Sequence, residues 1–157
     1  MLCVRAGKKQ GMKIYLDFDG TVVEHQYPKM GRCNFGCMEV IKKLQDAGHE
    51  IILNTYRADC NDGTLWDALD LFEKAWMVTK PRNLDFSLKP IKHLKEKRHP
   101  MTFDIPYFKE SGIFFIDDQC KGTPLKRAAM SDGWIVDWDK LDTILEENGM
   151  YQKVMVA

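Results

Sequence analysis

Two acidic residues separated by a single position, Asp17 and Asp19, follow an apolar run near the start of the chain. The run, residues 14–16, is typical of a buried parallel strand, and Gly20 ends it where the chain leaves the sheet. Both carboxylates would then lie at the carboxyl end of a strand, where open α/β sheets bind their ligands. Two acids this close are costly to ionise together unless a cation or hydrogen-bond donors lie between them. Mg²⁺ suits such hard oxygen ligands, and an aspartate beside it can attack phosphorus to form an aspartyl-phosphate.

Two later apolar runs also end in polar side chains. Residues 51–53 and 113–116 each predict a buried strand; Asn54 and Thr55 follow the first. A helix between the first two strands makes a βαβ unit, so these strands should be parallel. Parallel neighbours lie about 4.8 Å apart, and their carboxyl ends share one edge of the sheet. We therefore expect one polar site at that edge, formed by Asp17, Asp19, Thr55, Asp117 and Asp118.

The segment Asp-Phe-Asp-Gly-Thr-Val-Val at residues 17–23 resembles motif I of the haloacid dehalogenase superfamily, Asp-x-Asp-Gly-Thr followed by two hydrophobic residues after a strand. The four motifs of the superfamily (acid pair, Ser or Thr, Lys, acid pair) occur here in that order over most of the chain. The resemblance implies a phosphate-ester hydrolase, a phosphatase, in which Asp17 is the nucleophile that becomes the aspartyl-phosphate. Asp19 would be the general acid/base, which protonates the leaving oxygen and then deprotonates the attacking water.

The resemblance also implies a set of ligands for Mg²⁺. Motif I would supply the carboxylate of Asp17 and the backbone carbonyl of Asp19, and the pair Asp117 and Asp118 would complete the metal shell. Thr55 matches motif II, whose hydroxyl and amide hold the transferring phosphoryl group. Phosphoryl transfer depends mainly on positioning and charge neutralisation, which such a site provides.

The catalytic lysine of motif III has three candidates. Lys109 closely precedes the strand at residues 113–116, whereas Lys80 and Lys89 are each followed by proline. The chain looks like a small subgroup of these hydrolases with His-x-x-Pro after motif I, Thr-x-Arg after the second strand and Ile-Asp-Asp-Arg or similar at the last motif, where this chain has Gln119. A lysine shortly before the last motif is usual in that subgroup, which favours Lys109 over its two rivals.

Four residues beside the motifs are candidates for substrate binding: Gly20, His25, Asn54 and Arg57. His25 could contact a substrate from the loop after motif I, or make only a hydrogen bond within that loop. Arg57 could bind a phosphate or carboxylate through two hydrogen bonds, or form a salt bridge at a helix end.

Helical periodicity predicts the elements that flank the first strands. A helix would begin at the N-cap Asn34 and end at Gly48, which supplies the left-handed C′ position. A second helix would begin at residue 64 and place the aromatic residues Trp66, Phe72 and Trp76 in the core.

The later segments are assigned in the same way. Residues 77–79 are a candidate short strand, and residues 89–99 predict a basic helix, either a solvated face or a docking surface for a polyanionic substrate. Thr-Pro at residues 123–124 is typical of a helix start, so we expect a helix over 123–133. A short strand at 134–136 and a closing helix around 141–145 complete the chain.

Composition limits the class of protein. The 157 residues, 45% hydrophobic and 29% charged, suit one globular domain over residues 12–157. Residues 1–11 look like a disordered leader, or they precede an alternative start at Met12. The net charge of zero gives no electrostatic case for nucleic acid or an anionic membrane, and no apolar run approaches a transmembrane length. Five cysteines lack the spacing of a disulfide framework; Cys33 and Cys37 have no partner pair for a zinc site. We expect reduced thiols and a cytoplasmic protein.

These elements predict a doubly wound three-layer α/β sandwich with a mostly parallel central sheet and no sizeable cap domain. Only one loop and one helix fit between Asp19 and Thr55, so the site should be open. The substrate would be a phosphorylated small molecule or an exposed phosphate on a macromolecule, and a homo-oligomer partner could supply a lid. A nucleotide or nucleic-acid-end phosphatase is the alternative enzyme. A phospho-acceptor signalling module or a binding module is the non-enzyme alternative, and the late acid pair argues against the former.

Overall fold

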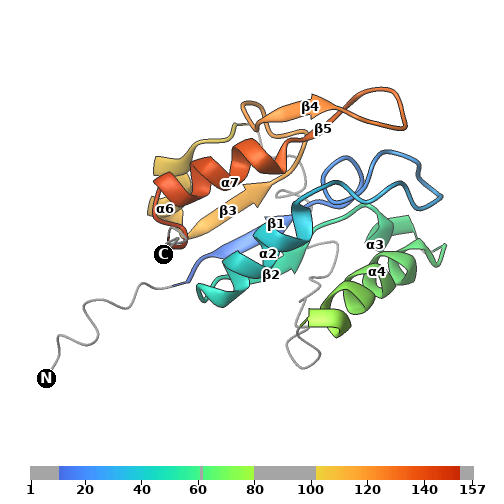
Figure 1. The fold of residues 1–157 in the computed structure, drawn as a ribbon, viewed down its shortest axis with the longest axis horizontal. Coiled ribbons are helices and arrows are strands. Elements are labelled where there is room, and N and C mark those ends of the chain that lie inside the picture. The colour runs from blue at the N-terminus through green and yellow to red at the C-terminus, as the bar shows by residue number, and fades with distance from the viewer. Residues whose placement is uncertain (1–10, 61, 80–101, 153–157) are drawn as a thin grey trace, which may run out of the picture.

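A computed structural model describes residues 11–60, 62–79 and 102–152 of the chain (Figure 1). Its centre is a three-stranded sheet in the order β2-β1-β3, formed by β1 (Lys13–Leu16), β2 (Glu50–Leu53) and β3 (Ile113–Ile116). Both neighbours run parallel to β1, and Leu16 lies opposite Leu53 and Ile116. The three predicted strands and their parallel pairing are confirmed. Because the last residues of the strands are in register, the segments that follow them leave the sheet at the same level.

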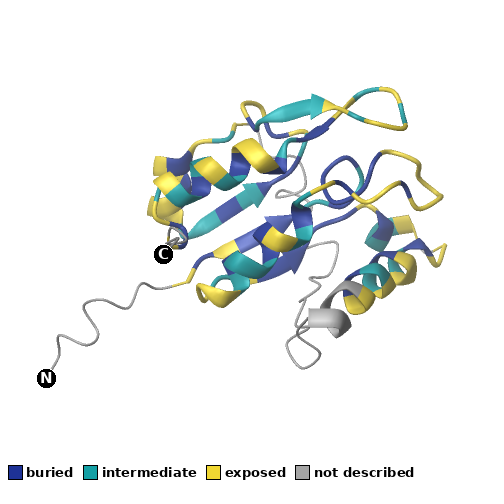
Figure 2. Ribbon diagram, in the orientation of Figure 1, coloured by how far each residue is buried: buried dark blue, intermediate teal, exposed yellow. Residues whose placement is uncertain are grey.

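The two faces of this sheet bury different sets of side chains, as the alternation of a strand requires. Ile14, Leu16 and Ile116 belong to the main hydrophobic core, whereas Tyr15 and Ile52 form a second, smaller cluster. In the burial view β1 and β2 are buried except at their first residue, whereas β3 alternates between intermediate and buried residues (Figure 2).

Helix α2 (Cys37–Asp46) covers the main core with Val40, Ile41 and Leu44. It ends as predicted: Gly48 is left-handed (φ 95°), and the His49 N–H donates to the Leu44 carbonyl at 3.1 Å, as in a Schellman motif.

The predicted N-cap of α2 is wrong. Gly36 occupies that position, and no side chain caps it. The Asn34 side chain instead donates to the carbonyl oxygens of Thr21 (2.9 Å) and Val136 (2.7 Å), two segments distant in sequence. Both acceptors are buried backbone groups that only the tertiary fold brings close to Asn34. The sequence around Asn34 therefore cannot distinguish this role from that of a helix N-cap.

Two further helices come before and after β3 in the chain. Helix α6 (Ile105–Ser111) begins at the N-cap Asp104, whose side chain accepts the Tyr107 N–H, and leads into β3 through Gly112. Helix α7 (Trp138–Glu147) is the predicted closing helix; it begins at the N-cap Asp137 and lies beside α2 (Figure 1).

Helices α3 (Arg57–Cys60) and α4 (Thr64–Thr79) follow β2. The strand expected at residues 77–79 is wrong, because α4 continues through them. Phe72 is buried as predicted, and its ring centroid lies 5.9 Å from that of Phe18. Trp66 is 70% exposed, so the prediction that it lies in the core is wrong. The Trp76 side chain lies outside the described part.

The helix expected over residues 123–133 is wrong. The segment forms the first strand and the loop of a hairpin, in which β4 (Leu125–Arg127) pairs antiparallel with β5 (Trp134–Val136). Tertiary contacts override the local Thr-Pro signal here. The buried carboxylate of Glu24 accepts hydrogen bonds from the N–H groups of Ala129 (3.1 Å) and Met130 (3.0 and 3.2 Å) and from the Ser131 hydroxyl (2.9 Å), and these bonds fix the hairpin loop.

The fold is thus mixed α/β, with a small parallel sheet, flanking helices and a separate hairpin. Between Asp19 and β2 the chain forms only a loop and α2, as predicted. Among the described helices, none has both the length and the apolar character needed to cross a bilayer. Residues 1–10 of the predicted leader and the predicted basic helix at 89–99 lie outside the described residues, whereas Gly11 already packs against the Gly48 backbone.

Candidate metal centre

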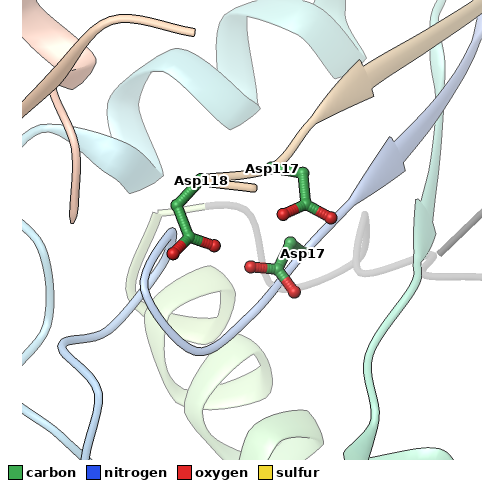
Figure 3. A group of neighbouring side chains, drawn as sticks. All are labelled: Asp17, Asp117 and Asp118. Atoms are coloured by element: carbon green, nitrogen blue, oxygen red, sulfur yellow. The ribbon is translucent and has the colours of Figure 1, made fainter. Parts of the chain in front are cut away.

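Three carboxylates meet at the carboxyl edge of the parallel sheet. Asp17 follows β1, and Asp117 and Asp118 follow β3; one oxygen from each lies within 4.8 Å of the others (Figure 3). The sheet sets this arrangement, because the Asp17 N–H still pairs with the Ile116 carbonyl at 2.9 Å. Within the described residues, this is the one group of three or more acidic, histidine or cysteine side chains with metal-binding geometry.

Burial and mutual repulsion make these acids hard to ionise together. Burial raises the pKa of Asp117 to about 7, and the charge of Asp118 adds to the shift. The pKa of Asp17 lies well above its usual value, first because of burial and then because of repulsion from the other two carboxylates. Ionising all three carboxylates would therefore place more negative charge here than the surroundings compensate, and a bound cation would offset it.

Asp118 has a partner of its own. Its Oδ2 lies 2.9 Å from His25 Nε2. Burial opposes ionisation of Asp118, but the hydrogen bonds that it shares with His25 and Asp17 outweigh burial and lower the pKa of Asp118. The same contact with Asp118 raises the pKa of His25. His25, predicted as a substrate contact, thus lies at the acidic site as a direct neighbour of a candidate ligand.

Gly20 permits this contact. It is left-handed (φ 88°), and a Cβ at this position would lie 2.1 Å from His25 Nε2 and 2.5 Å from Asp118 Oδ2. Any side chain here would push the imidazole off the carboxylate. The requirement for glycine in the motif is therefore steric as well as conformational.

Thr21 links the two acidic segments, a role that we did not assign from the sequence. Its hydroxyl donates to Asp17 Oδ2 (2.8 Å) and accepts the N–H of Asp118 (3.2 Å). Thr21 is fully buried. The signal was present in the motif itself, where threonine follows Asp-x-Asp-Gly directly.

Asp19 lies in an ion pair with Arg57. The carboxylate accepts two hydrogen bonds from the guanidinium, at 2.8 and 2.7 Å. Arg57 is buried between the rings of Phe18 and Tyr27, and it also donates to the Lys29 carbonyl at 2.8 Å. Of the two roles considered for Arg57, the structure shows a salt bridge, with the second acid of motif I as its partner.

Asn54 and Thr55 lie at the same edge, directly after β2. Both are buried, and the Asn54 N–H donates to the Leu16 carbonyl at 2.7 Å. The Thr55 hydroxyl accepts the N–H of Arg57 at 3.1 Å and so begins the turn into α3. The predicted convergence of strand ends therefore extends to both residues.

Lys109 is not brought to this group. It lies on α6, ahead of β3, and its ammonium group donates to the carbonyl oxygen of Asn148. That contact is at the edge where β3 begins, whereas the carboxylates follow the edge where it ends. The rival candidates Lys80 and Lys89 lie outside the described residues.

Comparisons with known proteins give one structural relative. No protein-family model matches the chain, and no curated protein sequence matches it. A solved structure of a conserved protein from Bacteroides thetaiotaomicron is similar, with 28% sequence identity over 88% of this chain and 93% of that one and a TM-score of 0.51. The likeness extends over nearly the full length of both chains, so it concerns the whole α/β arrangement and not one motif.

Proposed function

We propose that the chain is a magnesium-dependent phosphomonoester hydrolase with a haloacid dehalogenase-like fold, working through an aspartyl-phosphate on Asp17. One observation carries the proposal: the carboxylates of Asp17, Asp117 and Asp118 have oxygens within 4.8 Å of one another. They lie at the carboxyl edge of a parallel sheet, the edge at which such sheets bind ligands.

The donor set fits Mg²⁺. The three carboxylates offer only hard oxygen ligands, and the raised pKa values of Asp17 and Asp117 indicate uncompensated negative charge. We assign Asp17, Asp117 and Asp118 as side-chain ligands, with the backbone carbonyl of Asp19 as a fourth. Bound there, Mg²⁺ would neutralise charge on the phosphate and keep the nucleophilic carboxylate ionised.

The residues around Asp17 support its role as nucleophile. Thr21 holds the carboxylate through Oδ2, and this fixes its orientation for an in-line attack on phosphorus. The ester oxygen then leaves, and water attacks the phosphorylated Asp17 to release phosphate and regenerate the carboxylate.

Asp19 would transfer the protons in both steps. Its carboxylate accepts two hydrogen bonds from Arg57, so a protonated Asp19 has to give up at least one of them. Arg57 is therefore a positioning residue in this proposal and makes no contact with the substrate. The cationic group that would contact the phosphate is Lys80 or Lys89, or it lies elsewhere in the chain, because Lys109 lies at the opposite edge of the sheet.

Phosphate release from a broad panel of phosphomonoesters, with and without Mg²⁺, tests the proposal. We expect turnover that a chelator abolishes and that Asp17→Asn lowers by about a thousandfold or more. Asp46→Asn, which removes an exposed carboxylate at the end of α2, is the matched control and should keep full activity. Undiminished turnover in Asp17→Asn would sink the covalent mechanism. Mg²⁺ binding without turnover of any small ester would point to a macromolecular substrate.

A further inference from the structure

Two cysteine thiols lie in contact outside the acidic site. The Sγ atoms of Cys33 and Cys37 are 3.8 Å apart. Cys33 is exposed, whereas Cys37, the first residue of α2, is buried in the main core. One sulfur is therefore accessible to a small reagent, and the second lies directly behind it.

The backbone holds this pair together from both sides. The Cys37 N–H donates to the Asn34 carbonyl at 3.3 Å, and the Asn34 side chain is tied to the carbonyl oxygens of Thr21 and Val136. Cys33 forms an isolated antiparallel bridge with Val23. The proximity of the sulfurs follows from these backbone contacts and is not an accident of two surface rotamers.

The two thiols differ in acidity mainly because they share a hydrogen bond, which acts on their pKa values in opposite directions. The hydrogen bond with Cys37 lowers the pKa of Cys33 to about 7, and the pKa of Cys37 is raised by the same bond and by burial. Cys33 is thus the nucleophilic thiolate near neutral pH, and Cys37 keeps its proton until a reactive sulfur is next to it.

We propose that Cys33 and Cys37 are a redox-active pair that forms an intrachain disulfide on reaction with a hydroperoxide. The Cys33 thiolate attacks the terminal oxygen of the hydroperoxide and breaks its O–O bond, which gives a sulfenic acid on Cys33 and releases an alkoxide, or hydroxide from hydrogen peroxide. The Cys37 thiol then attacks the sulfenic sulfur, so that the S–S bond forms and water leaves. The two thiols supply the two electrons that reduce the peroxide. This inference is independent of the hydrolase proposal.

A metal is the other ligand that a cysteine pair can take, and it needs further donors. Within the described residues, the acidic site is the one cluster with metal-binding geometry, and neither cysteine belongs to it. The disulfide is therefore the chemistry that the pair can complete by itself.

Mass spectrometry of the reduced full-length protein after one equivalent of hydrogen peroxide tests the pair. Trypsin cleavage after Arg32 and Lys42 leaves both cysteines in one peptide, residues 33–42. We expect this peptide to lose two hydrogens, about 2 Da, and to regain them with a reducing agent. Met38 lies in the same peptide, and its sulfoxide adds oxygen, so the two products differ in mass.

Two variants and an internal control make the test decisive. Cys33→Ser alters an exposed side chain and should abolish the mass loss. Cys37→Ser should leave a sulfenic acid on Cys33 that a 1,3-dicarbonyl reagent traps. Cys60 is also exposed, but its thiol donates to the Tyr56 carbonyl; Cys33 should react at least about tenfold faster. Equal rates for Cys33 and Cys60, or oxidation of Cys33 to a sulfinic acid with Cys37 still reduced, would overturn the proposal.

Discussion

The two edges of the parallel sheet satisfy their polar groups in opposite ways. At the amino edge, His49 accepts the Met12 N–H and contacts the Met150 carbonyl at 2.7 Å, and Lys109 donates to the Asn148 carbonyl. At the carboxyl edge, three carboxylates face one another, and the pKa values of two are raised. The protein's own backbone pairs the polar groups of the first edge, whereas the carboxylates of the second repel one another, and the proposed Mg²⁺ would offset that repulsion. The comparison therefore sets groups that stabilise the fold against groups that we propose bind a ligand.

Removing a carboxylate from the carboxyl edge should have the largest effect. Asp117→Asn deletes a candidate ligand, so Mg²⁺ affinity should fall by more than the roughly 100-fold that is typical of outer-shell changes. Thermal stability without metal should not fall, because the substitution relieves repulsion between buried acids. Calorimetric Mg²⁺ titration and a thermal melt measure both quantities. Unchanged affinity would mean that the acidic group is not the metal site.

The pair Asp19–Arg57 differs from the other groups at the carboxyl edge, because its two charged side chains neutralise each other. Arg57→Lys keeps the charge but loses the two-point hydrogen bond. Combined with Asp19→Asn in a double-mutant cycle of urea unfolding, it should show a coupling free energy of about 1–3 kcal/mol. Additive effects of the two substitutions would show that the two-point hydrogen bond contributes nothing to stability.

At the amino edge, His49→Ala should act on stability alone. It removes the acceptor for the Met12 N–H and the contact with the Met150 carbonyl, and we expect a loss of about 1–3 kcal/mol in the free energy of unfolding. Mg²⁺ affinity should match that of the unsubstituted protein. A lower Mg²⁺ affinity in this variant would show that the amino edge also affects metal binding, and would contradict the division of roles between the two edges.

The smallest effect concerns Glu24 and depends on pH. Its pKa is lowered from 4.5: burial opposes this shift, but hydrogen bonds from Ser131, Met130 and Ala129 outweigh it. A depressed pKa means that the stabilisation is present above about pH 4.5 and is lost as the pH falls through the folded-state value. The melting-temperature difference between the protein and Glu24→Gln should therefore shrink below that pH. A difference that is constant with pH would contradict the role of the carboxylate.

The strands and their acidic ends were predictable because the information is local. Short apolar runs followed by Asp or Thr identify both a buried strand and its polar end, and parallel pairing aligns those ends. The hairpin at residues 125–136 was not predictable in this way, since its loop is held by Glu24, more than 100 residues away in the sequence. The salt-bridge partner of Arg57 was not predictable from local sequence either, since Asp19 is 38 positions away. Trp66 fits the helical spacing of apolar residues, but the way α4 packs on the rest of the protein decides which face of the helix is exposed to solvent.

The hydrogen bonds between the hairpin and the loop after β1 affect how fast backbone amides exchange their hydrogens with solvent. Glu24 accepts the amide hydrogens of Ala129 and Met130, and the Val136 N–H donates to the Gly20 carbonyl at 3.1 Å. We therefore expect the loop after β1 and the hairpin to open together. Hydrogen exchange at these three amides reports on local opening around the acidic residues, although two of the amides belong to a surface turn.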